Sequence, residues 1–129
     1  MAVKYLNIGE EHYPISFGML AFKEFDNIFD VPIKNMVDEI PALLENASLD
    51  TMLTITWIGI NDGYRRLKQE VPITKEDLAD KMDEAGAFAV GYEAMIIAME
   101  GFNALVRNLE LTKTGQAVTR KKTPTRGRQ

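Results

Sequence analysis

The sequence predicts a mainly α-helical protein: a compact helical domain over residues 1–110 that includes a short N-terminal β-hairpin, followed by a disordered basic tail over residues 111–129. Three observations predict this fold. Apolar residues recur at spacings of three and four through most of the domain, which is the period of amphipathic helices. Two short β-favourable runs open the chain. The last nineteen residues carry six basic side chains, no acid and few apolar side chains, a composition that buries too little surface to fold alone.

The predicted hairpin consists of residues 3–8 and 12–16, which flank a turn that contains Gly9. Pro14 lacks a backbone N–H, so the second run is expected at a sheet edge. A two-stranded ribbon is marginally stable alone in water. The hairpin must therefore pack on the protein's own helices or accept a strand from another chain, and the sequence leaves both interpretations open.

The first helix is predicted to begin near Gly18 and to end near Asp30, because three phenylalanines follow one another at helical spacing. They are Phe22, Phe25 and Phe29. A second amphipathic helix follows Pro32, a residue that is tolerated in a first helical turn. Pro41 is expected to kink or stop this helix, because a proline inside a helix removes a hydrogen bond.

The third helix is predicted to begin after Ser48, a residue suited to the N-cap, and to continue to about Glu70. Its apolar stripe keeps the same phase through Asn61-Asp62-Gly63, so the helix is expected to continue through these residues. The stripe consists of Leu49, Leu53, Trp57, Ile60, Tyr64 and Leu67. We expect this face to pack against the rest of the domain.

The fourth helix is predicted to begin at Thr74, whose hydroxyl suits the N-cap, with acids in the first turn that oppose the helix dipole. Its buried line is Leu78, Met82 and Ala85. Its other positions are strongly anionic: Glu76, Asp77, Asp80, Asp83 and Glu84. These acids lie on a helix and lack the alternating spacing of a calcium-binding loop. We therefore interpret them as a solvated or partner-facing acidic surface, without a metal.

The last helix of the domain is predicted to have two packing faces. Large apolar residues repeat at strict 4-3 spacing: Phe88, Tyr92, Met95, Met99, Phe102, Val106 and Leu109. Small residues repeat one position earlier: Ala87, Gly91, Ala94, Ala98 and Gly101. The first pattern is typical of a helix beside a nearly parallel neighbour, and small side chains allow another backbone to approach. The helix is therefore either the centre of the domain or half-buried by a second subunit.

Charge divides the chain into two parts. Residues 1–110 carry nine basic and nineteen acidic residues, a net charge of 9 − 19 = −10, whereas residues 111–129 carry +6. Such asymmetry is typical of a chain that handles partners. The simplest interpretation of Arg120-Lys121-Lys122 is a solvated tail, and the next is contact with a protein, including the acidic fourth helix. Nucleic acid is disfavoured, because the acidic domain repels phosphates and no aromatic residue interleaves the basic ones.

Composition disfavours catalysis. The chain has no cysteine, so thiolate metal sites and cysteine nucleophiles are excluded. His12 is the only histidine, and no phosphate-binding loop follows a strand. We therefore predict a protein that is not an enzyme and binds no cofactor or metal. Glu93 and Glu100 argue against a membrane span in the last helix, and the first residues lack the pattern of a signal peptide.

Four segments of the domain carry a family resemblance. They are Tyr5-Leu6-Asn7-Ile8-Gly9, Tyr13-Pro14-Ile15-Ser16-Phe17-Gly18, Trp57-Ile58-Gly59-Ile60-Asn61-Asp62-Gly63-Tyr64-Arg65, and Ile73-Thr74-Lys75-Glu76-Asp77-Leu78 followed by Met82-Asp83. With these segments the chain resembles the tail assembly chaperones of long-tailed, non-contractile bacteriophages over residues 3–110. The resemblance implies a small helical protein that coats the tape-measure protein, helps to recruit tail tube subunits, and leaves before the tail is finished.

The resemblance also implies a location and a second gene product. Such a chaperone acts in the cytoplasm of the bacterial host and is absent from the mature virion. In the family, a programmed −1 ribosomal frameshift yields a longer product whose extension engages the tail tube protein. The codons of Lys121-Lys122 could form the run of adenines on which such a frameshift occurs. The family motifs supply no residue-level binding site that maps onto this chain.

The expected function is therefore to bind and solubilise the tape-measure protein through many weak helix contacts, and self-association is also expected. The partner-binding residues inferred from burial and charge are Phe88, Tyr92, Met95, Met99, Phe102, Glu76, Asp77, Asp80, Arg120, Lys121 and Lys122. Two other functions stay open: a structural head-tail connector subunit of the virion, and a small nucleic-acid-binding regulator that uses the basic tail.

Overall fold

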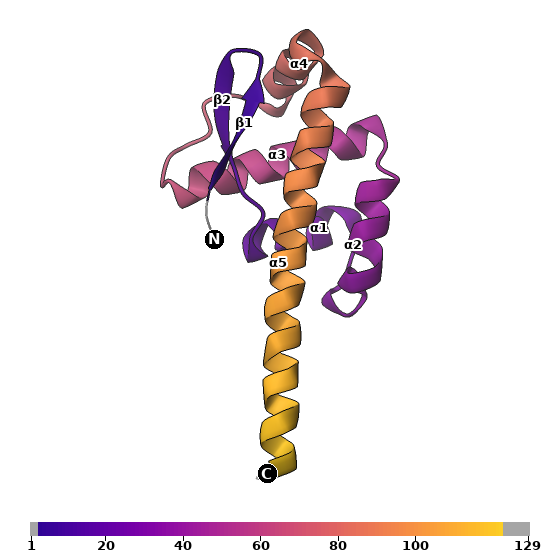
Figure 1. Cartoon of the computed structure of the whole chain (residues 1–129). Coiled ribbons are helices and arrows are strands. Elements are labelled where there is room, and N and C mark those ends of the chain that lie inside the picture. The colour runs from indigo at the N-terminus through magenta and orange to yellow at the C-terminus, as the bar shows by residue number, and fades with distance from the viewer. Residues whose placement is uncertain (1–2, 123–129) are drawn as a thin grey trace.

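Within residues 3–122, which the computed structural model describes, the chain forms an N-terminal hairpin and five α-helices (Figure 1). The strands are β1 (Lys4–Ile8) and β2 (Glu11–Ile15). The helices are α1 (Met19–Phe29), α2 (Met36–Glu45), α3 (Leu49–Arg66), α4 (Lys75–Ala85) and α5 (Ala87–Lys122), and a 3-10 turn at Ile33–Asn35 precedes α2. The mainly α fold class with an N-terminal hairpin, predicted from the sequence, is confirmed.

The hairpin packs on the protein's own helices. β1 and β2 pair antiparallel with Leu6 opposite Tyr13, and Gly9 in the tight turn has a positive φ of 65°, which glycine adopts without strain. The side chains of Leu6, Ile8, Tyr13 and Ile15 are buried. β2 lies on α3, while β1 contacts α4 and α5. The helices thus supply the cover that an isolated two-stranded ribbon lacks.

Most helix ends agree with the signals in the sequence. α1 ends at its C-cap Asp30, which adopts a left-handed conformation. α2 continues past Pro41 to Glu45, so this proline does not stop the helix. α3 continues through Asn61-Asp62-Gly63 as predicted, but it ends at Arg66 and not near Glu70. The chain then turns at Lys68, which has a positive φ of 59°.

α3 is the central helix of the domain, because it contacts α1, α4, α5 and β2. Buried residues therefore lie around most of its circumference: Met52, Thr54, Ile55, Thr56, Ile58, Gly59, Ile60, Asp62 and Gly63. The apolar stripe predicted from Leu49 to Leu67 packs on the core only in its middle part: Ile60 is buried and Leu53, Trp57 and Tyr64 are partly buried, whereas Leu49 is 62% exposed and Leu67 is exposed as well. The hairpin covers one side of α3 and α5 covers another, so burial follows these neighbours and not the apolar stripe alone.

Two glycines of α3 allow the segment after β2 to lie directly on the helix. The backbone N–H of Ser16 donates to the carbonyl oxygen of Gly59 at 3.0 Å. A Cβ atom on Gly63 would lie 2.5 Å from the carbonyl oxygen of Pro14 and 2.6 Å from the backbone nitrogen of Ile15. A side chain at position 63 would therefore push the hairpin away from α3.

The core brings together aromatic rings from the first and last helices. The ring centroids of Phe22 and Phe25 lie 5.0 Å apart, and those of Phe22 and Phe102 lie 5.5 Å apart in an edge-to-face arrangement. Phe17, which precedes α1, also packs edge-to-face against Phe25. These contacts join the N-terminal third of the chain to the middle of α5.

The two stripes predicted for α5 have different roles. The stripe of small residues faces inward, and Ala94 and Ala98 are fully buried. Gly101 lies so close to the backbone of Phe17 that no Cβ atom would fit, and Gly91 lies against the side chain of Met52, which would have to move to admit one. The large side chains therefore turn partly outward. Phe88 and Tyr92 are exposed, Met95, Met99 and Val106 are half-buried, and Phe102 is buried. The small residues permit the close approach that determines which face of α5 becomes the core.

α5 extends well beyond the rest of the domain, as the yellow half of the helix in Figure 1 shows. The helix ends at Lys122, whereas the sequence placed the end of the helical domain at Glu110. Residues 108–122 contain no proline, and Pro124 is the first proline after Pro72, so no strong helix breaker ends α5 earlier. Residues 123–129 of the predicted disordered tail lie outside the described residues.

The N-cap of α4 offers a direct test of local stabilisation. The hydroxyl of Thr74 accepts from the backbone N–H of Asp77 at 3.0 Å, and the Asp77 carboxylate accepts from the backbone N–H of Thr74 at 3.0 Å. Thr74→Ala removes the acceptor at the cap and is expected to lower the free energy of unfolding by about 1 kcal/mol. Urea titration followed by circular dichroism measures the loss. Thr74→Ser keeps the hydroxyl and should stay close to wild type, so an equal loss in both variants would contradict this role.

Candidate partner-binding surface

An apolar groove lies between the N-terminal parts of α3 and α5, and we call it the α3–α5 groove. It has a volume of about 460 Å³. Its apolar lining consists of Ala47, Leu49, Met52, Phe88, Ala89, Tyr92 and Met95. The cap residue Ser48 adds a hydroxyl at one edge. The hydroxyl accepts from the backbone N–H of Thr51 at 3.2 Å, as predicted for an N-cap, which fixes the start of α3 and thereby the position of Leu49.

The large side chains of the α3–α5 groove are unusually exposed for apolar residues. Phe88 is 73% exposed and Tyr92 is 66% exposed, and Ile96, one further turn along α5, is exposed as well. These three residues form a strip along α5 at intervals of four. Contiguous apolar surface of this kind on a monomer commonly marks an interaction site. The strip is exposed because the small residues of α5 occupy the side that faces α3.

The structure separates the residues that the sequence grouped as partner-binding. Phe88, Tyr92 and Met95 line the α3–α5 groove, while Met99 is half-buried further along α5. Phe102 is only 3% exposed and packs on Phe22, so its inclusion in a partner-facing surface is corrected. A strict 4-3 repeat drifts around a straight helix by about 20° per heptad, so Phe88 and Phe102, two heptads apart, do not point in the same direction. The side chains of Arg120-Lys121-Lys122 lie outside the described side chains.

The acidic residues of α4 lie on an exposed face next to the start of α5. Glu76, Asp77 and Asp80 are all exposed, which agrees with a solvated or partner-facing surface. Asp77 is also engaged in the cap, and its hydrogen bond from the backbone of Thr74 holds the pKa of its carboxyl below the usual value. Glu76 and Asp80 are thus the more available acids of this surface.

The bases of α4 are already engaged. The ammonium group of Lys81 donates to the carboxylate of Glu11 at 2.9 Å, and this hydrogen bond lowers the pKa of Glu11 and raises that of Lys81. The ammonium group of Lys75 donates to the hydroxyl of Thr54 at 2.9 Å. The face of α4 therefore keeps a negative character.

A second hollow, of about 500 Å³, lies between α1 and α3. Leu20 and Ile28 of α1 form its exposed apolar walls, and Lys23, Glu24 and Arg65 bring charges of both signs to it. The sequence analysis did not identify this hollow. Leu20 and Ile28 are eight residues apart, which places them on one face of α1, and this spacing was the available signal.

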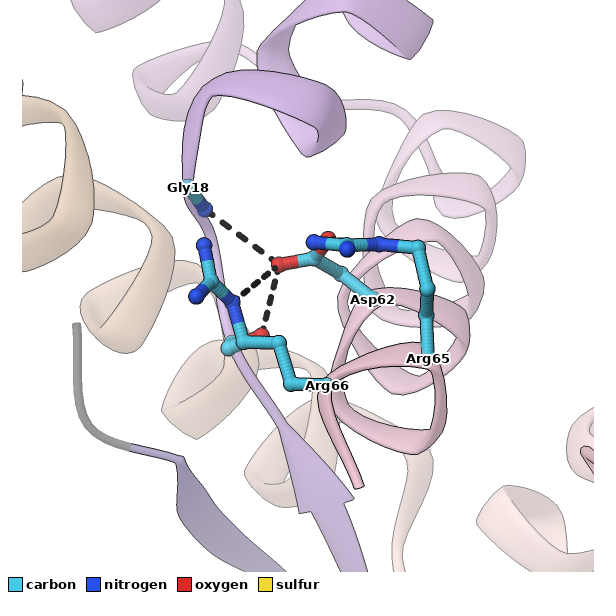
Figure 2. A network of polar contacts seen from close by, with 5 residues as sticks. Gly18, Asp62, Arg65 and Arg66 are labelled. Carbon is cyan, nitrogen blue, oxygen red and sulfur yellow. Dashed lines mark hydrogen bonds and ion pairs between the residues drawn. The ribbon is translucent and has the colours of Figure 1, made fainter. Parts of the chain in front are cut away.

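Asp62 forms a buried polar network at the centre of the fold (Figure 2). Its carboxylate is 3% exposed and accepts from the hydroxyl of Ser16 at 2.6 Å, from the guanidinium of Arg65 at 2.7 and 3.2 Å, and from that of Arg66 at 3.3 Å. The backbone N–H of Gly18 adds a longer contact at 3.4 Å. With its lone pairs occupied by these donors, the carboxylate fastens the segment between β2 and α1 to α3. It is not free to act as a general base.

The Asp62 network predicts a loss of stability in acid. Burial raises the pKa of Asp62, but the hydrogen bond from Ser16 and the interactions with Arg65 and Arg66 outweigh burial and hold the pKa below its ordinary value. The contribution to stability is therefore complete above the unfolded pKa of about 3.9 and is lost as the pH falls through the folded pKa. Melting temperatures measured from about pH 6 to about pH 3 should fall less steeply in Asp62→Asn than in the wild type. Parallel curves would contradict this assignment.

Part of α5, residues Ala87–Arg107, has the length and the mean hydropathy of 1.2 of a membrane span. One face of the same segment packs within the domain, where α5 contacts α2, α3, α4 and β1. Val90, Ala94, Ala98 and Phe102 are buried in these contacts. Another face is not covered, because Phe88, Tyr92 and Ile96 are exposed.

The α3–α5 groove is apolar, and its most exposed side chains are Phe88 and Tyr92. Among residues 3–122, no group of three or more His, Asp or Glu side chains is placed to hold a metal ion. No model of a protein family matches the chain, and no match is found among curated proteins or solved structures. The function must therefore be argued from the exposed apolar surface and from the charges around it.

Proposed function

We propose that this protein is a bacteriophage tail assembly chaperone, which binds the tape-measure protein and keeps it soluble until tail tube subunits assemble around it. The observation that supports this proposal best is the α3–α5 groove, where Phe88 and Tyr92 expose most of their surface on a rigid helix. An exposed aromatic pair beside an apolar groove suits the binding of a partner helix. The resemblance of residues 3–110 to the tail assembly chaperones supplies the identity of the client.

A single groove is expected to bind weakly. Burying roughly 300 Å² of apolar surface, the scale of two aromatic side chains, contributes about 7 kcal/mol at roughly 25 cal/mol per Å². Association costs about 4 to 15 kcal/mol in lost translational and rotational freedom. The two amounts are similar, so one copy holds its client only transiently. Many copies along a long tape measure give stable coverage, and each copy can still leave when tube subunits arrive.

The proposed setting is the cytoplasm of the bacterial host, and the protein is proposed to be absent from the mature virion. Protein analysis of purified particles tests this part, because a structural head-tail connector subunit would be present in fixed stoichiometry. We also propose that a longer, frameshifted product engages the tail tube protein. Sequencing the gene around the codons of Lys121-Lys122 tests that step: the lack of a slippery heptamer before an overlapping frame would exclude it.

Co-expression with the tape-measure protein tests the function directly. The wild-type chain is expected to move most of the tape-measure protein from the insoluble to the soluble fraction. The double variant Phe88→Ser, Tyr92→Ser removes both exposed rings and should abolish most of this effect, because few interface residues carry most of the binding free energy. Soluble fractions are measured by quantitative gel analysis.

The hollow between α1 and α3 provides a matched control. Leu20→Ser, Ile28→Ser removes two exposed apolar side chains between α1 and α3, and it should leave solubilisation intact. Both variants change surface residues, and a melting temperature near that of the wild type confirms folding of each. Equal loss in the two double variants would place the client elsewhere. Failure of the wild-type chain to solubilise the tape-measure protein, in both its short and frameshifted forms, would refute the proposed function.

A further inference from the structure

We infer that the α3–α5 groove selects a cationic amphipathic helix: a partner segment with apolar anchors on one face, flanked by lysine or arginine. This inference rests on the proposed function for the identity of the client and adds the chemistry by which the client is recognised. The geometry of the groove supports a helix as the occupant, and the charge around the groove separately supports a basic one.

The geometry favours a helix as the occupant. The exposed strip from Phe88 to Ile96 spans nine residues, and its eight steps rise about 12 Å at 1.5 Å per residue. This length matches the about 10.5 Å between anchors at positions i and i+7 of a partner helix. The walls of the groove are helices and not strands, so no strand edge is offered to an extended peptide. A segment that loses water here must satisfy its own backbone, as a helix does.

The charge favours a basic partner. The stretch over residues 35–61, which contributes the α3 wall, contains four acids and no lysine or arginine. The stretch over residues 82–99, which contributes the α5 wall, contains three acids and again no basic residue. Asp50 follows Leu49 and Glu93 follows Tyr92, and both acids are exposed. Basic residues that flank the anchors would therefore meet charges of opposite sign along both walls.

The hollow between α1 and α3 shows that this pattern is specific to one surface. Its lining includes Lys23 and Arg65 as well as Glu24, so it carries no single sign of charge. An anionic lipid surface is a poor occupant of the α3–α5 groove, because the acids on both walls would repel it. The α3–α5 groove thus has an uncharged lining with the exposed acids Asp50 and Glu93 next to lining residues in the sequence, whereas charges of both signs line the α1–α3 hollow.

A pair of designed peptides tests the inference with the full chain. Both carry leucines at i, i+4 and i+7 of one helix, and they differ only in flanking lysines or flanking glutamates. Fluorescence anisotropy at low salt should show that the lysine peptide binds at least about ten-fold more tightly than the glutamate peptide.

The double variant Asp50→Asn, Glu93→Gln should reduce this preference several-fold, and so should a rise in salt. The double variant Phe88→Ala, Tyr92→Ala should lower the affinity for the lysine peptide by about thirty-fold. The double variant Leu20→Ala, Ile28→Ala should leave this affinity unchanged.

Three results would overturn the inference. The first is equal affinity for the two peptides, and the second is equal loss in the two alanine double variants. The third is binding of the lysine peptide only after residues 111–129 are removed, because the groove would then be occupied by the basic segment of a second copy. The result also separates this inference from the proposed function. If the chain prefers the lysine peptide but does not solubilise the tape-measure protein, only the identity of the client is refuted. If it solubilises the tape-measure protein but binds the two peptides equally, only the preference for a cationic helix is refuted.

Discussion

Gly63→Ala is expected to lower the free energy of unfolding by about 3 kcal/mol, an overpacking loss at the upper end of the usual range. In an ordinary helix the same change would raise stability by about 1 kcal/mol, because alanine is the better helix former. Here the new Cβ atom would meet the carbonyl oxygen of Pro14 at 2.5 Å and the backbone nitrogen of Ile15 at 2.6 Å. Backbone atoms of a paired strand cannot rotate away, so the hairpin must shift as a whole.

Gly91→Ala is the matched control for this prediction. Its Cβ atom would also be close to a neighbour, at 2.5 Å from the Cγ atom of Met52. Methionine is flexible and can adopt another rotamer, so we expect a change within about 1 kcal/mol. Urea unfolding of both variants measures the difference. Similar losses at positions 63 and 91 would show that crowding alone, and not the rigidity of the neighbour, determines the effect.

Asp62→Ala is expected to cost about 3 kcal/mol, because it removes the acceptor of a buried charged network. The hydroxyl of Ser16, which is buried, and the backbone N–H of Gly18 lose their acceptor. The side chain of Arg65 is 47% exposed, so water can solvate its guanidinium when the carboxylate is removed. The loss of the Arg65–Asp62 pair therefore contributes little to the change in stability. The loss therefore comes mainly from the unpaired groups between β2 and α1 and from Arg66, whose side chain is only 26% exposed.

Chemical unfolding at neutral pH measures this loss, and Asp38→Asn on the exposed face of α2 serves as the control. The control should remain within about 0.5 kcal/mol of the wild type, as surface substitutions usually do. The double variant Ser16→Ala, Asp62→Ala removes donor and acceptor together. It should be less destabilised than the sum of the two single variants, because the groups share one network. Strict additivity would mean that Ser16 and Asp62 act separately.

Local signals in the sequence predicted the elements and several of their ends. Ser48 and Thr74 both act as N-caps, because capping depends on residues within one turn of the helix. The hairpin and the continuity of α3 through Asn61-Asp62-Gly63 were likewise predicted from neighbouring residues. These features follow from chain geometry over short distances, which the sequence displays directly.

The buried face of each helix is determined by contacts with elements of the same chain that are distant in the sequence. The stripe from Leu49 to Leu67 is apolar, yet α3 is buried where the hairpin and α5 cover it. On α5 both stripes were expected to pack; the small residues do form the contact, whereas Phe88 and Tyr92 of the large stripe are exposed. The Asp62 network joins residues 46 positions apart, and a lone aspartate in a helical pattern gives no sign of it. The exposure of Phe88 and Tyr92 follows from the same choice of face.

The projecting half of α5 has a mechanical consequence. From Arg107 to Lys122 the helix rises about 22 Å at 1.5 Å per residue, and Figure 1 shows this half directed away from the globular body. Any polypeptide joined after Lys122 would begin at the end of that spacer. The arm therefore sets a distance of about 22 Å between the globular body and the start of any module joined after Lys122.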